Sequence, residues 1–473
     1  MGLTRQITKN FSWLFFGEFL NGLISFFIVV YLARVLGVKT FGLLSFVQAF
    51  LIYLLIVVDA GFTPYGIREM AKDISQRHRL AVNIIALRII WGLLVYLMAA
   101  VCLLFLPLAF ELKLLFAVTF LLVISKNMSP EWIFHGLERF EYVGLEKILN
   151  RSILALLIVL FVKGASDLIK APFLEFVVGF VVASLFLTLI VTRFVSFRAR
   201  EIKFKDWRYY FVEAAPMGIS YVLLQLYFNI DTVMLGLMNR IEDVGFYSAA
   251  YKIIFALLIF ATVLGKSIYP VLSRLYAGNR EKMKKLVSAL FNYNLFLGIP
   301  IAVGGMILSE PIVLLVFGAK YYPAAWAFRI LVWTILTVYT SAPFTFSLLA
   351  AGRQRDYFYG MAAGASVNIL LNLFLIPSYG FVGAAVAKIV TEVIVWGIIF
   401  YYFSKNVFYI PLQRSVPKYL VSAAVMGLFI YFVKINIFLS VIGGAAVYLL
   451  FNLLLGSVSL KGAYETIRLA VNG

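Results

Sequence analysis

A few ionisable side chains stand inside long apolar runs of this sequence, and they are the residues most suited to chemistry. Asp231, in FNIDTVMLG (228–236), is the only charged residue between Glu213 and Arg240. A charge in hydrocarbon is costly, so such groups usually face a bundle interior or an aqueous cavity, where they bind ions or polar substrates. The full set comprises Glu18, Asp59, Arg88, Glu175, Asp231, Lys252, Lys388 and Glu392.

Carboxylates in this set are candidates for binding a coupling ion, either H+ or Na+. We select Asp59, Asp231 and Glu392 for this role. Ion pairing is the alternative, because Glu392 follows Lys388 at i, i+4 on one helix face. Asp231 has a second possible partner in Lys252, which is expected at a similar depth on the following helix.

Two polar stripes follow the helical period. Glu18, Asn21 and Ser25 share one face of the first apolar run. Tyr221, Gln225 and Asn229 form a corresponding stripe in the seventh run, in which Tyr221 lies 203 residues after Glu18. The stripes are predicted to line a cavity, and hydrogen bonding between packed helices is the alternative.

The elements that position these residues are transmembrane helices. Hydrophobic residues make up 63% of the 473 positions and charged residues only 13%, far from the composition of a soluble domain. Runs of about 20 apolar residues can cross a bilayer as helices. We therefore predict an all-α polytopic membrane protein with about fourteen spans, near 11–33, 41–61, 81–106, 109–129, 148–165, 171–192, 214–237, 244–265, 288–308, 328–350, 358–376, 382–403, 419–433 and 437–456.

Lys and Arg residues define the expected topology. Most of the 41 fall on the side that carries both termini and the even-numbered turns. Cytoplasmic connections are enriched in these residues, so both termini are expected inside the cell. The net charge of +19 then faces anionic lipid headgroups, and no nucleic-acid partner is expected.

A weak internal repeat suggests two halves of six helices each. At an offset of 203 residues, FGLLS (41–45) meets VGFYS (244–248), at the start of the second helix of each half. Equal orientation of the halves indicates a parallel, pseudo-symmetric repeat. The predicted divisions are an N-terminal lobe (1–205), a C-terminal lobe (206–405), and two extra helices with a tail (406–473).

Enzymatic function is not expected from this sequence. No P-loop, nucleophile–His–acid set or long extramembrane connection is present. The single cysteine, Cys102, and the two separated histidines, His78 and His135, do not form a metal-ligand pattern. We therefore expect neither a metal nor another cofactor, apart from coupling to H+ or Na+.

Several long motifs recur in order over nearly the whole chain: YLARVLGVKTFGLLSFVQAF (31–50), DAGFTPYGIREMAK (59–72), PEWIFHGLERF (130–140), FNIDTVMLGLMNRIEDVGFYSAAYKI (228–253) and VNILLNLFLIPSYGFVGAAVAK (367–388). Together they resemble bacterial polysaccharide or O-antigen repeat-unit flippases (Wzx-type) of the multidrug/oligosaccharidyl-lipid/polysaccharide exporter superfamily. In PEWIFHGLERF, His135 stands where Gln is usual in that family.

The resemblance implies a two-lobed fold like that of MATE transporters and the lipid II flippase. It also implies alternating-access transport of an undecaprenyl-pyrophosphate-linked oligosaccharide from the cytoplasmic to the outer leaflet, driven by membrane potential or an ion gradient. Expected partners are this substrate, membrane lipids, a polysaccharide polymerase and chain-length machinery. The expected location is the bacterial or archaeal cytoplasmic membrane.

A cationic cavity that suits the pyrophosphate is a further implication of the resemblance. Interfacial anchoring is the alternative for the two cations at span ends, Arg34 and Arg68, and snorkelling to headgroups is the alternative for Arg88. The candidate cations in this sequence are Arg34, Arg68, Arg88, Lys252 and Lys388.

Other functions remain open at this stage. A MATE-like drug exporter would have the same fold but an acidic, aromatic cavity, and a lipid II or teichoic-acid precursor flippase would differ little in sequence. A membrane polymerase or acyltransferase would need a catalytic pair or a long loop, and neither is seen.

Overall fold

The computed structural model describes residues 3–196, 198–411, 415–433 and 436–457, with side chains left out at 3–12, 14–15, 74, 199, 219–227, 259–260, 262–263 and 266. The described chain is helical and contains no β-strand, so the prediction of an all-α protein is confirmed. Two compact units are formed, Met1–Gly236 and Leu237–Gly473, which we call the N-terminal and C-terminal units.

The N-terminal unit contains long apolar helices and several short ones between them. Its helices are α1 (Leu3–Leu36), α2 (Val38–Asp59), α3 (Phe62–Lys72), α4 (Arg77–Phe105), α5 (Phe110–Phe120), α6 (Leu122–Met128), α7 (Glu131–Gly136), α8 (Phe140–Phe161), α9 (Lys170–Leu185) and α10 (Phe204–Leu237), of which the last crosses the unit boundary.

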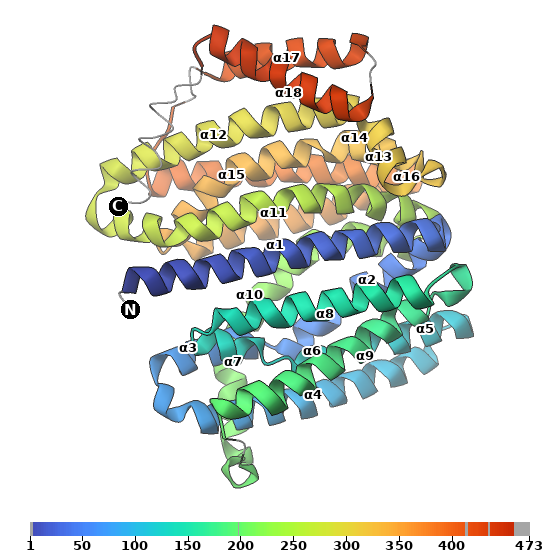
Figure 1. The fold of residues 1–473 in the computed structure, drawn as a ribbon, viewed down its shortest axis with the longest axis vertical. Helices are drawn as coiled ribbons and strands as arrows, with labels where there is room; N and C mark the ends of the chain where they lie inside the picture. Colours follow the sequence, from blue (N-terminus) through green and yellow to red (C-terminus); the bar gives the residue numbers. More distant parts are fainter. Residues whose placement is uncertain (1–2, 197, 412–414, 434–435, 458–473) are drawn as a thin grey trace. The chain divides into compact units, whose positions relative to one another are not determined.

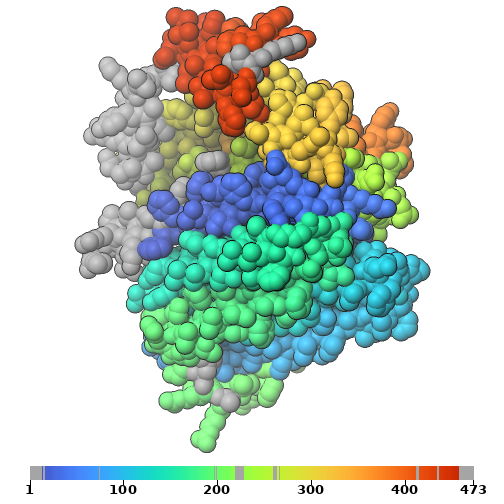
Figure 2. All heavy atoms as spheres, turned by 45° about the vertical axis from the view of Figure 1, so that its right-hand side comes forward, coloured from blue at the N-terminus to red at the C-terminus, as the bar shows by residue number. Residues whose placement is uncertain are grey.

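Helix packing in this unit brings distant segments of the chain together (Figure 1). Figure 2 shows α1, in blue, lying directly against α8, in teal. Glycines permit the approach, since a Cβ on Gly17 would lie 2.7 Å from the Cα of Gly144. α8 also packs on α9, while the short helices α3 and α7 pack on each other.

The C-terminal unit follows the same principle of apolar helices joined by short turns. Its helices are α11 (Ile241–Gly278), α12 (Arg280–Ile307), α13 (Ser309–Phe317), α14 (Ala324–Leu331), α15 (Trp333–Ala350), α16 (Gln354–Asn406), α17 (Val416–Val433) and α18 (Ile437–Leu454). The last two pair with each other, and α17 packs on α12 (Figure 1).

The long element α16 is a helical hairpin rather than one straight helix. Gly380 has φ 56° and ψ −134°, a conformation that is open essentially to glycine. The two ends of α16 meet, because Asn406 Nδ2 donates to Asp356 Oδ2 at 2.6 Å. The turn predicted between the spans 358–376 and 382–403 is therefore present.

Many helix faces expose large apolar side chains, as lipid-facing helices do. On α4 these include Leu97, Met98, Leu104 and Phe105. Ten helices of the described residues are long and apolar enough to cross a membrane, which supports a polytopic membrane protein. The count of fourteen spans and the lobes 1–205, 206–405 and 406–473 stay predictions.

Candidate functional site

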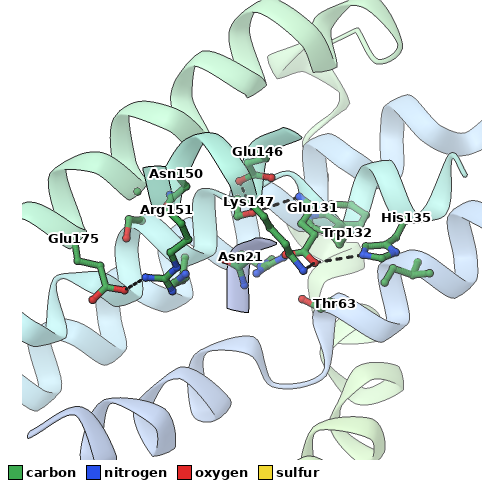
Figure 3. A pocket seen from close by; sticks show the side chains of 16 residues that line it. Asn21, Thr63, Glu131, Trp132, His135, Glu146, Lys147, Asn150, Arg151 and Glu175 are labelled. Carbon is green, nitrogen blue, oxygen red and sulfur yellow. Dashed lines mark hydrogen bonds and ion pairs between the residues drawn. The ribbon is translucent and has the colours of Figure 1, made fainter. Parts of the chain in front are cut away.

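The N-terminal unit contains a polar cavity of about 300 Å³ among its helices (Figure 3). Charged, amide and hydroxyl side chains dominate its walls, although the helices that carry them are largely apolar. The lining residues are Asn21, Thr63, Ile67, Arg88, Ser125, Lys126, Ser129, Glu131, Trp132, His135, Glu146, Lys147, Asn150, Arg151, Glu175 and Gly179.

The short helix α7 presents Glu131 and His135 to the cavity from one face, because the two residues are spaced i, i+4. The imidazole Nε2 lies 3.3 Å from Glu131 Oε1. Trp132 is buried, and its indole packs against Gly66 of α3, where a Cβ would come within 2.5 Å of the ring. A glycine at position 66 is therefore needed for α3 to hold α7 at the cavity wall.

Lys147 of α8 joins three helices at the cavity. Its Nζ lies 2.7 Å from Glu18 Oε1 of α1 and 2.7 Å from Glu131 Oε1 of α7. One ammonium group thus bridges two carboxylates, while His135 contacts the same oxygen of Glu131 (Figure 3).

A second ion pair crosses the cavity wall one helical turn further along α8. Arg151 Nη1 lies 3.0 Å from Glu175 Oε1 of α9 (Figure 3). Close packing of α9 on α6 supports this wall, since a Cβ on Gly179 would meet Ser125 Oγ at 3.1 Å. Each of these two charges at the cavity wall is therefore compensated by the other.

Arg88 of α4 is buried inside the unit, with 6% of its surface exposed. Its Nη2 lies 3.6 Å from Asp59 Oδ1, an oxygen that also accepts a hydrogen bond from Thr63 Oγ1. Arg88 Nε and Nη1 are buried and have no hydrogen-bond partner within the described structure. The guanidinium therefore retains unused donors beside the cavity.

Two other charged side chains at the cavity have polar atoms that form no hydrogen bond within the described structure. Lys126 of α6 has an exposed side chain on the cavity wall, with no ion pair or hydrogen bond among the described residues. Glu146 of α8 is buried and accepts a hydrogen bond from Ser129 Oγ at its Oε1, at 2.9 Å. Its Oε2 has no partner in the described part of the chain.

Of the residues predicted from the sequence in this unit, some lie at the cavity and others lie away from it. Asn21 lines the cavity and Glu18 contacts its wall through Lys147, whereas Ser25 is not among the lining residues. Arg34 is exposed at the end of α1. Arg68 lies beside Glu69 and Glu213, with its guanidinium over the ring of Tyr65, away from the cavity lining.

The polar stripe predicted on the seventh span falls on α10. The side chains of Tyr221 and Gln225 lie outside the described residues. Asn229 is partly buried and Asp231 is buried, both in the N-terminal unit. Lys252 belongs to the C-terminal unit, and its pairing with Asp231 stays a prediction.

In the C-terminal unit, Lys388 and Glu392 are buried and form the i, i+4 pair, with Nζ 3.3 Å from Oε1. Asn372 Nδ2 donates to Asn368 Oδ1 at 3.0 Å in the first arm of α16. Both contacts satisfy buried polar groups inside the unit, and a role of these residues in transport stays a prediction.

The C-terminal unit contains an apolar groove of about 550 Å³. It runs between α12 and the pair α17–α18. Its walls include Phe296, Pro300, Met426, Ile430 and Tyr448, and they offer almost no polar surface.

Most charged residues at the polar cavity were not selected from the sequence. The interval 130–147 was assigned to a connection, but it contains α7 and the first turns of α8. A usable signal was present, because Glu146 and Asn150, like Lys147 and Arg151, are spaced i, i+4. Four residues of that interval were missed in this way: Glu131, His135, Glu146 and Lys147. Lys126 and Arg151, near the ends of the predicted spans 109–129 and 148–165, were not selected either.

Comparison with protein families and known proteins gives concordant results. The model of the family described as "Polysaccharide biosynthesis protein" matches residues 7–276, more than half of the chain, and the MatE model matches residues 216–374. A protein of Escherichia coli K12 whose name proposes it as an O-antigen transporter is 23% identical, over 85% of this chain and 97% of its own. A Shigella dysenteriae protein with the same name is 21% identical, over 82% of this chain and 97% of its own.

Among solved structures, the inward closed conformation of the lipid II flippase MurJ is similar in fold. It superimposes with a TM-score of 0.75 at 15% sequence identity, covering 93% of this chain and 98% of the MurJ chain. At this identity the likeness concerns the fold alone.

Proposed function

Because the chain belongs to the polysaccharide biosynthesis protein family, we propose that it is a flippase for a lipid-linked oligosaccharide. In this proposal the substrate carries a diphosphate between its polyprenyl lipid and its sugars, and it moves from the cytoplasmic to the outer leaflet by alternating access. The O-antigen transporter names of the relatives support the substrate class.

The polar cavity of the N-terminal unit is the observation that carries the proposal. Seven charged side chains line this cavity among apolar helices, an arrangement that usually serves a polar ligand or an ion. Three of the four cations already pair with carboxylates, whereas Lys126 is exposed to the cavity and has no partner among the described residues. Lys126 is therefore the cation most available to a phosphate oxygen, and Arg88 has donors in reserve.

The apolar groove of the C-terminal unit supports the lipid part of the proposal. A polyprenyl chain is a hydrocarbon, and its transfer from the bilayer into a groove with almost no polar surface needs no desolvation of charge. Phe296 and Met426 on its walls supply the apolar contact surface.

Membrane potential is a sufficient driving force in this proposal. Moving one charge through 100 mV is worth about 2.3 kcal/mol. A diphosphate diester with about two negative charges would therefore leave an inside-negative cell with a gain of roughly 4–5 kcal/mol per 100 mV. ATP hydrolysis is not required for export of such a substrate.

Transport by the purified full-length chain in vesicles tests the proposal. Undecaprenyl-diphosphate-linked oligosaccharide with a fluorescent sugar would be placed in both leaflets, and its protection from an impermeant quencher followed over time. We expect flipping that accelerates when the potential favours outward movement of anions. Vesicles that hold correctly folded protein and show no flipping above protein-free controls would refute the function.

Lys126→Ala supplies the residue-level arm of the same assay. Loss of the available cation should lower the flipping rate at limiting substrate by about tenfold or more, since charge-assisted hydrogen bonds contribute about 1.5–3 kcal/mol. Lys113→Ala is the matched control, because Lys113 Nζ bonds the backbone oxygen of Leu104 and does not line the cavity. Equal rates for both variants would remove Lys126 from the substrate path.

A lipid II flippase is the second candidate, favoured by the likeness in fold to MurJ. Lipid II shares the diphosphate and the polyprenyl tail, so the cavity and the groove suit it equally. Competition between labelled oligosaccharide lipid and unlabelled lipid II in the vesicle assay separates the two functions.

A further inference from the structure

We propose that Glu146 is a proton-binding site and that it takes up a proton when an oxyanion enters the polar cavity. The proposal rests on the proposed function only for the identity of that oxyanion, the diphosphate of the substrate. Proton binding at this position links the charge of the cavity to its occupancy.

The environment of the Glu146 carboxyl group is the primary observation. Only 7% of the residue is exposed, although it belongs to the lining of the cavity. Oε1 accepts a hydrogen bond from Ser129 Oγ, whereas Oε2 is closed to water and has no hydrogen-bond partner in the described structure. A buried carboxylate oxygen without a partner is strongly unfavourable, and a proton bound to Oε2 removes both the charge and this cost.

The other carboxylates at the cavity are held differently. Glu131 Oε1 lies 2.7 Å from Lys147 Nζ, and Glu175 Oε1 lies 3.0 Å from Arg151 Nη1. Each therefore has a cation within ion-pair distance, which stabilises its charged form. Glu146 has only a neutral hydroxyl donor, so it is the carboxylate at this site whose protonation disrupts no ion pair.

Charged groups from every neighbouring helix surround Glu146. The cations are Lys126 of α6, Arg88 of α4, and Lys147 and Arg151 on its own helix. The acidic groups are Glu131 of α7, Glu175 of α9 and Glu18 of α1, and His135 of α7 is also titratable. Lys126 and Lys147 favour the carboxylate form of Glu146, while Glu131 opposes it.

Linkage between proton and anion follows from this balance. Protonation forms one O–H bond on the Glu146 carboxyl group, with the proton taken from water, and breaks no bond in the substrate. It removes one negative charge from the wall and so increases the attraction of Lys126 for an oxyanion. By reciprocity, a bound oxyanion favours the protonated form of Glu146 to the same degree.

Binding and proton uptake by the full-length protein in detergent test the inference. The probe is undecaprenyl diphosphate, with binding followed by intrinsic tryptophan fluorescence and proton uptake by an indicator dye in weak buffer. For the wild type we expect up to one proton per bound ligand, and an affinity that rises towards tenfold per pH unit as pH falls, the limit for one linked proton. Glu146→Gln should bind without that uptake, and with an affinity that follows only the titration of the ligand itself.

Two further variants make the result interpretable. Glu141→Gln lies on α8 outside the cavity lining and should keep the wild-type uptake. Ser129→Ala removes the hydrogen bond to the carboxylate form, so the midpoint of proton uptake should move to higher pH. This variant tests Glu146 even if Glu146→Gln folds poorly.

Wild-type uptake and pH response in Glu146→Gln, together with an unshifted midpoint in Ser129→Ala, would overturn the assignment. Failure of the flippase function is a separate outcome, since it would appear as linked proton and diphosphate binding without flipping in vesicles. A pH-dependent flipping rate in the wild type that is unchanged in Glu146→Gln would instead refute the inference alone.

Discussion

At the scale of single residues, Lys147 decides how three helices meet at the polar cavity. Its ammonium group lies between carboxylates of α1 and α7 while its backbone belongs to α8. Its side chain is 22% exposed, so the contacts lie between those of a surface pair and those of a fully buried one. Such a residue links the stability of the unit to the charge state of the site.

Lys147→Ala should destabilise the folded protein by on the order of 2 kcal/mol, because it leaves Glu18 and Glu131 without their shared cation. The measurement is the thermal unfolding midpoint of the purified protein in one detergent. Adding Glu131→Gln to Lys147→Ala should recover part of the loss. An unchanged midpoint in Lys147→Ala would show that the bridge does not stabilise the unit.

At the scale of helices, glycine positions determine which pairs can pack closely. α1 and α8 approach each other where Gly17 faces Gly144, and the Glu18–Lys147 contact lies beside that crossing. Small residues at a helix crossing permit close backbone approach in a membrane. The cavity wall therefore depends on two residues that have no side chain.

Gly17→Ala should destabilise the protein by about 1–3 kcal/mol, because the new Cβ would overlap the backbone of α8. Gly164→Ala is the control, since no atom lies within 4 Å of its would-be Cβ. Thermal unfolding in detergent measures both. Equal stability of the two variants would mean that α1 does not pack on α8 at this crossing.

The hairpin of α16 depends on Gly380 for a different reason. Besides its positive φ, a Cβ there would lie 2.2 Å from Asp243 Oδ2, and Arg240 Nη2 donates to the oxygen of Pro377 at 2.6 Å in the same turn. The motifs around positions 240 and 380, far apart in sequence, thus build one turn.

Gly380→Ala should lower the unfolding midpoint and the yield of folded protein, with a cost on the order of 1–3 kcal/mol for the strained backbone. Gly397→Ala lies in the second arm of α16 with open space around the new Cβ, and should be neutral or slightly stabilising. Size-exclusion profiles and thermal unfolding distinguish these outcomes. A Gly380→Ala variant as stable as the wild type would contradict the assigned turn geometry.

At the scale of the whole molecule, charge distribution predicts the orientation in the membrane. In a Cys102→Ser background, Asn279→Cys should react with an impermeant maleimide only from the cytoplasmic side, because it lies in a strongly basic connection. Lys320→Cys, in a connection with few cations, should react from outside in intact cells. The reverse labelling pattern would invert the topology. Both positions are exposed in the structure, so labelling depends on sidedness.

The sequence by itself determined the class of molecule, because long apolar runs can exist only as membrane helices or buried cores. The cost of isolated charges pointed to Arg88 and Glu175, and the polar stripe pointed to Glu18 and Asn21, all of which lie at or beside the cavity. The motif PEWIFHGLERF (130–140) pointed to the segment that contains α7, but it did not indicate that Glu131 and His135 line a cavity.

Only the tertiary structure decided which charges meet. From the sequence, Glu131, Glu146 and Lys147 are residues of a connection between spans, where a charged side chain costs little because it can reach the membrane surface. Packing of α3, α7 and α8 turns that segment inward, so the same residues become the wall of a cavity. Ion pairs between helices distant in sequence depend on backbone distances of a few ångströms, and helical periodicity specifies only the face that each helix presents.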